Sequence, residues 1–81
     1  MIEPKFVKGD YIINRACGDM AIVSGINKKG YYTFKAYYGD MFKEIKSKDY
    51  TLQVNYQKFY EPCTEEEKQK LDNIIKENGG K

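Results

Sequence analysis

The sequence predicts a small, mainly β domain in which about five short antiparallel strands are followed by one carboxyl-terminal α-helix. Two observations predict the strands. The glycines of four turns, Gly9, Gly18, Gly30 and Gly39, are spaced 9, 12 and 9 residues apart, as in sheets of short strands joined by tight turns. Between these turns, apolar and polar residues alternate with the period of a strand. A third observation predicts the helix, because a capping sequence and helical apolar spacing follow Pro62.

The length and the cysteine content limit what kind of protein this can be. The 81 residues are expected to form a single domain, with a barrel over about 6–60 and a helix over about 64–78. Cys17 and Cys63 match no zinc or redox spacing, so we expect free thiols in a reducing compartment. No apolar stretch resembles a signal peptide or reaches the length of a membrane span. We therefore expect a cytoplasmic protein without a membrane partner.

The first two predicted strands are residues 11–14 and 19–26. The second strand is apolar on both faces, with Met20, Ile22 and Ile26 on one face and Ala21 and Val23 on the other. Such a strand is typical of the centre of a sheet, where another layer covers each face. Residues 27–30 read Asn-Lys-Lys-Gly, and Asn and Gly adopt positive φ easily. We therefore expect a hairpin turn there.

The third predicted strand, residues 31–38, alternates two sets of side chains. Because Lys35 resists burial, its face is expected to point outward, and the opposite face with Phe34 is expected to point into the core. The same alternation places Tyr31 and Tyr37 beside Lys35 on the outer face.

The remaining strands are predicted from turns and alternation. A turn at Gly39 and Asp40 leads into a fourth strand at residues 41–45. A turn at residues 47–49 leads into a fifth strand at residues 51–56, where apolar and polar side chains alternate again.

The end of the chain contains the clearest local signal. Thr64 and Glu67 have the spacing of a capping box, which predicts a helix over residues 64–78. The helix has one narrow apolar stripe, formed by Leu71, Ile74 and Ile75. We expect this stripe to dock on an open face of the barrel, on the side of Ala21 and Val23.

The sequence contains no set of residues that would support catalysis. Histidine is absent, which removes the usual general base and the commonest metal ligand. The glycines never take the spacing of a phosphate-binding loop. Asp10, Asp19 and Asp40 directly follow glycines, where Asp accepts backbone hydrogen bonds in turns. We therefore predict no catalytic residue, metal site or cofactor, and expect the protein not to be an enzyme.

The charge distribution indicates where a partner could bind. Residues 1–60 contain ten Lys or Arg and six Asp or Glu, whereas residues 61–81 contain four and six. The basic part coincides with the predicted strands. The candidate binding residues are the basic and aromatic side chains of the hairpin and of the outer strand face: Lys28, Lys29, Tyr31, Lys35 and Tyr37.

Three interpretations of this surface are open. The tyrosines could anchor a protein interface, where Tyr is enriched. They could instead stack nucleic-acid bases while the lysines neutralise phosphates. A small sheet built with eight tyrosines would also leave some rings partly exposed without any function. We favour a non-enzymatic module that binds another protein through this surface, with nucleic-acid binding as the alternative.

The chain also contains the pattern of a known family in Phe6, Gly9, Asp10, Ile12, Ile22, Ile26, Tyr32 and Phe34. In this order and spacing they resemble the opening of SH3-like small barrels of the KOW and Tudor type, in which Gly-Asp precedes the first long strand. The resemblance covers residues 6–38 and implies an SH3-like barrel. We expect a five-stranded barrel of this kind or a strongly bent antiparallel sheet, with an OB-like barrel as the alternative. Members of these groups bind RNA, DNA, modified peptides or proline-rich strands, so the resemblance implies no single partner class.

A second resemblance lies in residues 62–71, which read Pro-Cys-Thr-Glu-Glu-Glu-Lys-Gln-Lys-Leu. This segment resembles the closing helix of short uncharacterised bacterial and phage proteins that begin with such a barrel. A small accessory or inhibitor protein of a phage or mobile element would also fit the size of the chain.

Overall fold

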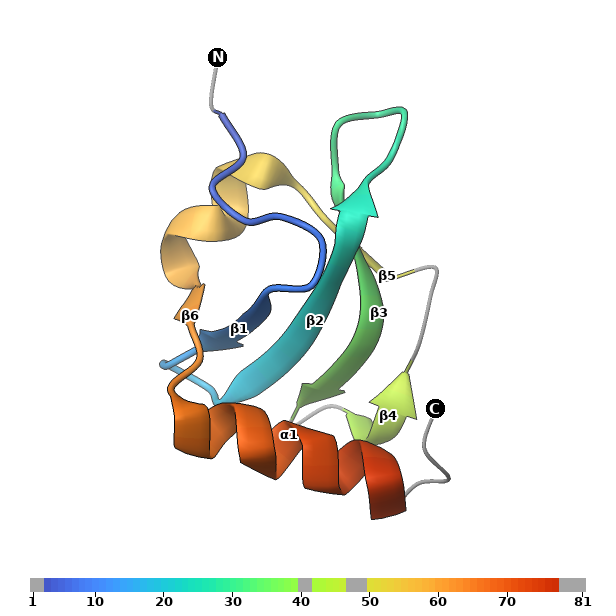
Figure 1. The fold of residues 1–81 in the computed structure, drawn as a ribbon. Coiled ribbons are helices and arrows are strands. Elements are labelled where there is room, and N and C mark those ends of the chain that lie inside the picture. Colours follow the sequence, from blue (N-terminus) through green and yellow to red (C-terminus); the bar gives the residue numbers. More distant parts are fainter. Residues whose placement is uncertain (1–2, 40–41, 47–49, 78–81) are drawn as a thin grey trace.

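The computed structural model describes residues 3–39, 42–46 and 50–77 as one antiparallel sheet with an α-helix across it (Figure 1). The strands are β1 (Tyr11–Asn14), β2 (Asp19–Ile26), β3 (Tyr32–Gly39), β4 (Phe42–Lys46), β5 (Tyr50–Leu52) and β6 (Glu61–Pro62). A 3-10 helix, η1 (Val54–Phe59), precedes β6, and the α-helix α1 (Glu65–Glu77) follows it. The strand order is β4-β3-β2-β1-β6, and β5 pairs with β3 as well. The predicted class, mainly β with a carboxyl-terminal helix, is confirmed.

Most predicted strand positions are confirmed to within one residue. β1 and β2 have the predicted bounds, whereas β3 and β4 each begin and end one residue later than predicted. Tyr31 precedes β3 because its amide donates to the Asn27 side chain, which holds it in the turn. The predicted turn at 47–49, and the residues at positions 40, 41 and 78, lie outside the described residues.

The predicted strand at 51–56 is wrong beyond Leu52, because residues Val54–Phe59 form η1 instead. The side chain of Gln57 is buried and bonds to the backbone of the amino-terminal segment. These hydrogen bonds to a distant segment turn the Gln57 side chain toward the core. Strand alternation takes account only of neighbouring residues, so it does not predict them.

The pairing of β2 with β3 contains an irregular step in its register. Ile22 is paired with Ala36, but the next residue, Val23, is paired with Phe34. Lys35 is therefore an extra residue in β3 with no counterpart in β2. Such a β-bulge changes which side of the sheet the following side chains face.

The bulge makes the predicted outward position of Tyr37 wrong. Tyr37 is only 8% exposed and lies in the same buried cluster as Phe34. Its Oη donates a 2.6 Å hydrogen bond to Oδ2 of Asp19. Burial and this hydrogen bond both raise the pKa of Tyr37 above that of a free tyrosine. A Cβ on Gly39 would collide with the same carboxylate, so the end of β3 approaches Asp19 closely only because Gly39 has no side chain.

The sheet has a hydrophobic core on each face. The first core is the buried cluster of Phe6, Ile12, Ala21, Val23, Tyr32, Phe34, Tyr37 and Tyr60. The second core is the buried cluster of Ile13, Met20, Ile22, Ala36, Cys63 and Leu71. Since β2 contributes to both clusters, the prediction that this strand is central and covered on each side is confirmed.

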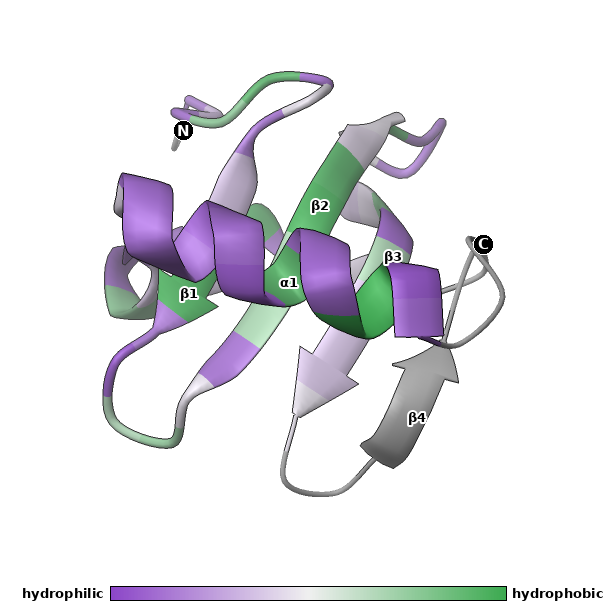
Figure 2. Cartoon of the chain, turned by 60° about the horizontal axis from the view of Figure 1, so that its bottom comes forward, coloured by the Kyte–Doolittle hydropathy of each residue, from purple (hydrophilic) through white to green (hydrophobic). Residues whose placement is uncertain are grey.

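The helix lies across the strands (Figure 2) and covers the second core, to which its hydrophobic residues belong. Leu71 is completely buried, and Ile74 and Ile75 pack partly buried beside it. The expected docking face, on the side of Ala21 and Val23, is wrong. That face is covered instead by residues from the amino-terminal segment and η1, which strand alternation alone does not place there.

The three Gly-Asp aspartates have different roles. Oδ2 of Asp10 accepts a 2.9 Å hydrogen bond from the amide of Val7, as predicted for an aspartate in a turn. Asp19 lies in β2 and accepts from Tyr37 instead. Asp40 lies outside the described residues.

The start of α1 is fixed by the predicted capping box. The Glu67 amide donates to Oγ1 of Thr64 at 3.2 Å, and the Thr64 amide donates to Oε1 of Glu67 at 2.8 Å. Two of the orphan amides at the helix start are thereby satisfied.

Arg15, in the turn between β1 and β2, connects this helix start to the sheet. Its Nη1 and Nη2 donate to the two carboxylate oxygens of Glu67 at 2.6 and 3.1 Å. Its Nε lies 3.1 Å from Oε2 of Glu61 in β6. A bidentate pair of this geometry fixes both partners better than a single contact, so the turn, β6 and α1 are held together.

Replacing Thr64 by Ala is expected to lower the free energy of unfolding by about 1 kcal/mol, because the cap is lost. Thr64→Ser keeps the hydroxyl and serves as the control. Urea denaturation measures both variants. An unchanged midpoint for Thr64→Ala would mean that α1 is not part of the cooperative unit.

Replacing Leu71 by Ala is expected to lower the free energy of unfolding by about 2–5 kcal/mol, because the side chain is fully buried under the helix. Ile75→Ala, at a partly buried position of the same stripe, should have a smaller effect. Both are measured by urea denaturation. Equal effects would contradict the docking of α1 through Leu71.

Acid is expected to weaken the attachment of α1. The hydrogen bonds from Arg15 and from the Thr64 amide lower the pKa of Glu67 from 4.5 to about 2. The folded state therefore binds this proton more weakly than the unfolded state. The stabilisation is complete above about pH 4.5 and is lost as the pH falls toward 2.

The measurement is the thermal midpoint of the wild type and of Glu67→Gln between pH 6 and pH 2. The difference between the two should be largest above about pH 4.5 and should vanish near pH 2. Glu66→Gln, at an exposed position of the same helical turn, is the control. A difference for Glu67→Gln that does not change with pH would contradict this prediction.

Candidate binding surface at the hairpin end

Three of the five predicted binding residues lie together at the hairpin between β2 and β3. Lys28 and Lys29 are exposed, and Tyr31 is half-buried. With Asn27 and Thr51 they line a shallow hollow of about 390 Å³. The structure thus brings these lysines and the tyrosine ring together, as predicted.

The other two predicted residues do not belong to this site. Lys35 is exposed at the bulge in β3, four positions along the chain from Tyr31, and does not line the hollow. Tyr37 is buried in the first core. The predicted outer sheet face of alternating tyrosines and lysine is therefore not present.

The hairpin is rigidly built, and its turn projects the two lysines away from the sheet. Oδ1 of Asn27 accepts hydrogen bonds from the amides of Lys29 and Tyr31 at 2.9 and 3.0 Å. Gly30 has a φ of 84°, in the left-handed region that favours glycine. The Asn27 amide also donates to the carbonyl of Tyr31 at 2.9 Å. These bonds therefore close the turn between the end of β2 and the start of β3.

A second group of exposed side chains lies on η1. The rings of Tyr56 and Phe59 are 45% and 54% exposed and stack on each other, with centroids 6.3 Å apart and an interplanar angle of 28°. Side chains three residues apart superimpose in a 3-10 helix, which explains the stacking. Nζ of Lys58 lies 5.3 Å from the centroid of the Phe59 ring. This is a solvent-facing aromatic pair beside a positive charge.

Buried hydrogen bonds orient η1. Oε1 of Gln57 accepts from the hydroxyl of Tyr32 and from the amide of Lys5, and Nε2 of Gln57 donates to the Glu3 carbonyl at 2.8 Å. In the sequence, Gln57 lies between Tyr56 and Phe59, and its side chain points inward. The hydrogen bonds of Gln57 therefore keep the opposite side of η1, which carries the two rings, toward solvent.

The amino-terminal segment runs beside η1 and is the third part of this surface. Phe6 is buried against Tyr32, with ring centroids 5.8 Å apart. The Tyr32 hydroxyl accepts from the amides of Lys5 and Phe6 at 2.9 and 3.2 Å. With Phe6 pointing inward, Val7 is 66% exposed and Lys8 is also exposed.

These three segments, residues 3–10, 26–31 and 53–59, lie in the half of the molecule opposite α1, with η1 and the hairpin on either side of the amino-terminal segment (Figure 1). We call this region the hairpin end. Among residues 3–39 and 51–77, whose burial is described, the exposed large hydrophobic side chains are Val7, Ile26, Tyr56 and Phe59, and all four belong to these segments. The hairpin end also carries five exposed lysines, Lys5, Lys8, Lys28, Lys29 and Lys58. Apolar side chains and positive charge therefore coincide at one end.

Acidic residues are scarce at the hairpin end. Its three segments contain only Glu3 and Asp10. Asp10 already accepts a hydrogen bond from the backbone of its own turn. Part of the excess of basic over acidic residues in residues 1–60 therefore lies at the hairpin end, which also exposes apolar side chains.

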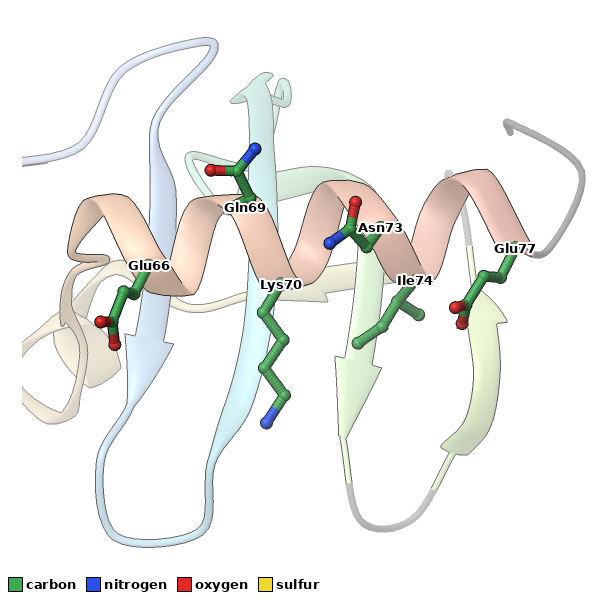
Figure 3. Close-up of a pocket in the computed structure, with 6 residues that line it drawn as sticks. All are labelled: Glu66, Gln69, Lys70, Asn73, Ile74 and Glu77. Atoms are coloured by element: carbon green, nitrogen blue, oxygen red, sulfur yellow. The ribbon is translucent and has the colours of Figure 1, made fainter.

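A hollow of about 470 Å³ lies on the helix side of the molecule (Figure 3). It is lined by Glu66, Gln69, Lys70, Asn73, Ile74 and Glu77. All six residues belong to α1, and in the close-up their polar groups spread to different sides of the helix and do not meet at one point. This hollow therefore offers no convergent set of binding groups.

Two shifted pKa values also belong to the contact between the helix and the sheet. A 2.5 Å hydrogen bond from Tyr11 to Asp72 is the main cause that raises the pKa of Tyr11 to about 12. Burial raises the pKa of the Cys63 thiol to about 11, and both cysteines are free as predicted. These groups stabilise the contact under α1 and do not face the hairpin end.

Within residues 3–39, 42–46 and 50–77, no three potential ligands among Cys, Asp and Glu gather where a metal ion could bind. Over the same ranges, no helix has the length and apolar character needed to cross a membrane.

The sequence contained a signal for the exposed aromatic pair that strand alternation obscured. Tyr56 and Phe59 are three residues apart with Lys58 between them, which is the spacing of one helical face. Residues 51–56 were expected to form a strand, which separated the two rings. The exposure of Val7 and Ile26 has no local signal, because both residues are as apolar as their buried neighbours.

No protein-family model matches the chain, and comparisons with curated proteins and with solved structures found no match either.

Proposed function

We propose that this protein is a non-enzymatic interaction module that binds another protein through the hairpin end. One observation carries this proposal: among residues 3–39 and 51–77, the exposed large hydrophobic side chains all lie on the three segments of the hairpin end, which also carry five exposed lysines. Exposed apolar groups with a polar rim are typical of protein interfaces. The proposed surface replaces the predicted sheet face, because Tyr37 is buried.

Tyr56 and Phe59 are the proposed anchors of this interface. Both rings are large, have few rotatable bonds and already stack on each other, so little conformational entropy is lost when they are covered. The hydrogen bonds of Gln57 hold the turn that carries them. Aromatic anchors on a fixed support are typical of interface hot spots.

The proposal extends to the fold family and the setting. An SH3-like barrel is supported by the antiparallel order of the strands and by the return of β6, after η1, to pair with β1. The free thiols of Cys17 and Cys63 support a reducing compartment such as the cytoplasm. A role as a phage or mobile-element accessory or inhibitor protein fits the size of the chain and the resemblance of residues 62–71 to short bacterial and phage proteins.

Nucleic-acid binding is the second candidate function, and the hairpin hollow is the observation that favours it. Lys28, Lys29 and Tyr31 line this hollow together. A base could stack on the half-buried ring while the two ammonium groups contact phosphates. This candidate uses one of the three segments of the hairpin end, whereas a protein partner uses all three.

Replacing Tyr56 and Phe59 together by Ser is expected to abolish capture of the partner. The tagged wild type, used as bait in a lysate of the cells that produce the protein, should retain a defined protein identified by mass spectrometry. The double variant should lose it, because two anchors are removed. Its urea denaturation should show a folded protein, since about half of each residue is exposed and neither belongs to a buried core cluster.

A variant with Gln69→Ala and Asn73→Ala on the exposed face of α1 is the matched control and should retain the partner. Equal capture by the wild type and by the Tyr56→Ser, Phe59→Ser variant would refute the proposed interface. Retention of only nucleic acid by the wild type, released by nuclease, would favour the second candidate.

A further inference from the structure

We propose that the partner docks on the hairpin end through an acidic segment that places an apolar side chain against the stacked rings of Tyr56 and Phe59. This inference rests on the proposed function and adds the chemistry of the partner. It follows from charge, from the exposure of the rings and from the kinds of side chain that surround them.

The charge of the hairpin end selects an acidic partner. Its five lysines are exposed, whereas its acids are Glu3 and Asp10, and the Asp10 carboxylate is already bonded within its turn. Like charges facing each other across an interface are unfavourable, so a basic segment would be rejected there. Carboxylates on the partner would be attracted, and they would speed up the encounter at low salt.

The lysines lie where they can act on a segment that crosses the rings. Lys58 is on the same turn as the aromatic pair, with its Nζ 5.3 Å from the Phe59 ring centroid. Lys28 and Lys29 are exposed in the hairpin turn, which Asn27 closes by hydrogen bonds with Gly30 and Tyr31. An acidic segment that extends from η1 toward the hairpin would therefore find lysines on both.

The apolar side chains of the hairpin end require an apolar group on the partner. Val7 and Ile26 are 66% and 43% exposed, and neither can bond to a carboxylate. Covering them together with the two rings removes apolar surface from water only if the partner supplies an apolar side chain. An acidic segment without such a residue would leave these groups uncovered.

The same side chains favour a protein segment over a nucleic acid. Bases stack on aromatic rings, but the aliphatic Val7 and Ile26 have no corresponding stacking face. The single arginine of the chain, Arg15, is engaged with Glu61 and Glu67 at the start of α1. The bidentate recognition of phosphate that arginine supplies is therefore absent from the hairpin end.

The test is a selection from a random peptide library displayed on phage, with the full-length protein as the target. Binding of the enriched peptides, and of a single-stranded oligothymidine, is then measured by fluorescence anisotropy. The enriched peptides should combine Asp or Glu with a Leu, Ile or aromatic residue. Their affinity should fall about tenfold or more when NaCl is raised from about 50 to about 300 mM.

Two charge-reversal variants are compared with the wild type. Lys29→Glu with Lys58→Glu should weaken binding of the enriched peptide about tenfold or more. Lys70→Glu with Lys76→Glu on α1 changes the net charge equally but lies at exposed positions of the helix, so it should leave binding within about twofold. Urea denaturation shows that each variant remains folded.

The outcomes separate this inference from the proposed function. Enriched peptides that need Tyr56 and Phe59 but lack acids, or that bind both charge variants equally, would overturn the acidic partner and leave the interface intact. Enriched peptides unaffected by Tyr56→Ser with Phe59→Ser, or an empty selection, would overturn both. Tighter binding of the oligothymidine than of any peptide would assign the surface to nucleic acid.

Discussion

The pairing of β2 with β3 is the interaction on which the rest of the structure depends, because side chains of both strands enter both cores. Each strand contains one extra residue: Lys35 in β3 and Ser24 in β2. The second insertion cancels the register shift of the first, so the hairpin keeps one register at its two ends. Between the two bulges the pair bends, which allows one face to receive Phe6 and the other to receive Leu71.

This arrangement leaves little of the sheet available for recognition. The helix covers one face, and the amino-terminal segment and η1 cover most of the other. Exposed apolar groups consequently gather at the end where the covering segments and the hairpin meet. A small domain with two cores thus leaves its proposed binding groups on turns and a short helix, which are held by hydrogen bonds within the hairpin turn and by those of Gln57 to Lys5 and to Tyr32 of β3.

The sequence predicted the features that depend on neighbouring residues. The capping box at Thr64, the hairpin at residues 27–30 and the central position of β2 all follow from local patterns, and all are present. The orientation of Tyr37 could not be predicted, because it depends on a bulge whose compensating residue lies on another strand. The exposed pair on η1 escaped for a similar reason: the buried contacts of Gln57 reach residues more than fifty positions away.

Those contacts also fix the order in which the chain can become ordered during synthesis. The amide of Lys5 is held by Tyr32 and by Gln57, which lie 27 and 52 positions further along the chain. During synthesis the amide of Lys5 leaves the ribosome before either partner, and its bond to Gln57 cannot form until 52 further residues have been added. The segment around Lys5 and Phe6 therefore cannot take its final place before η1 has been made.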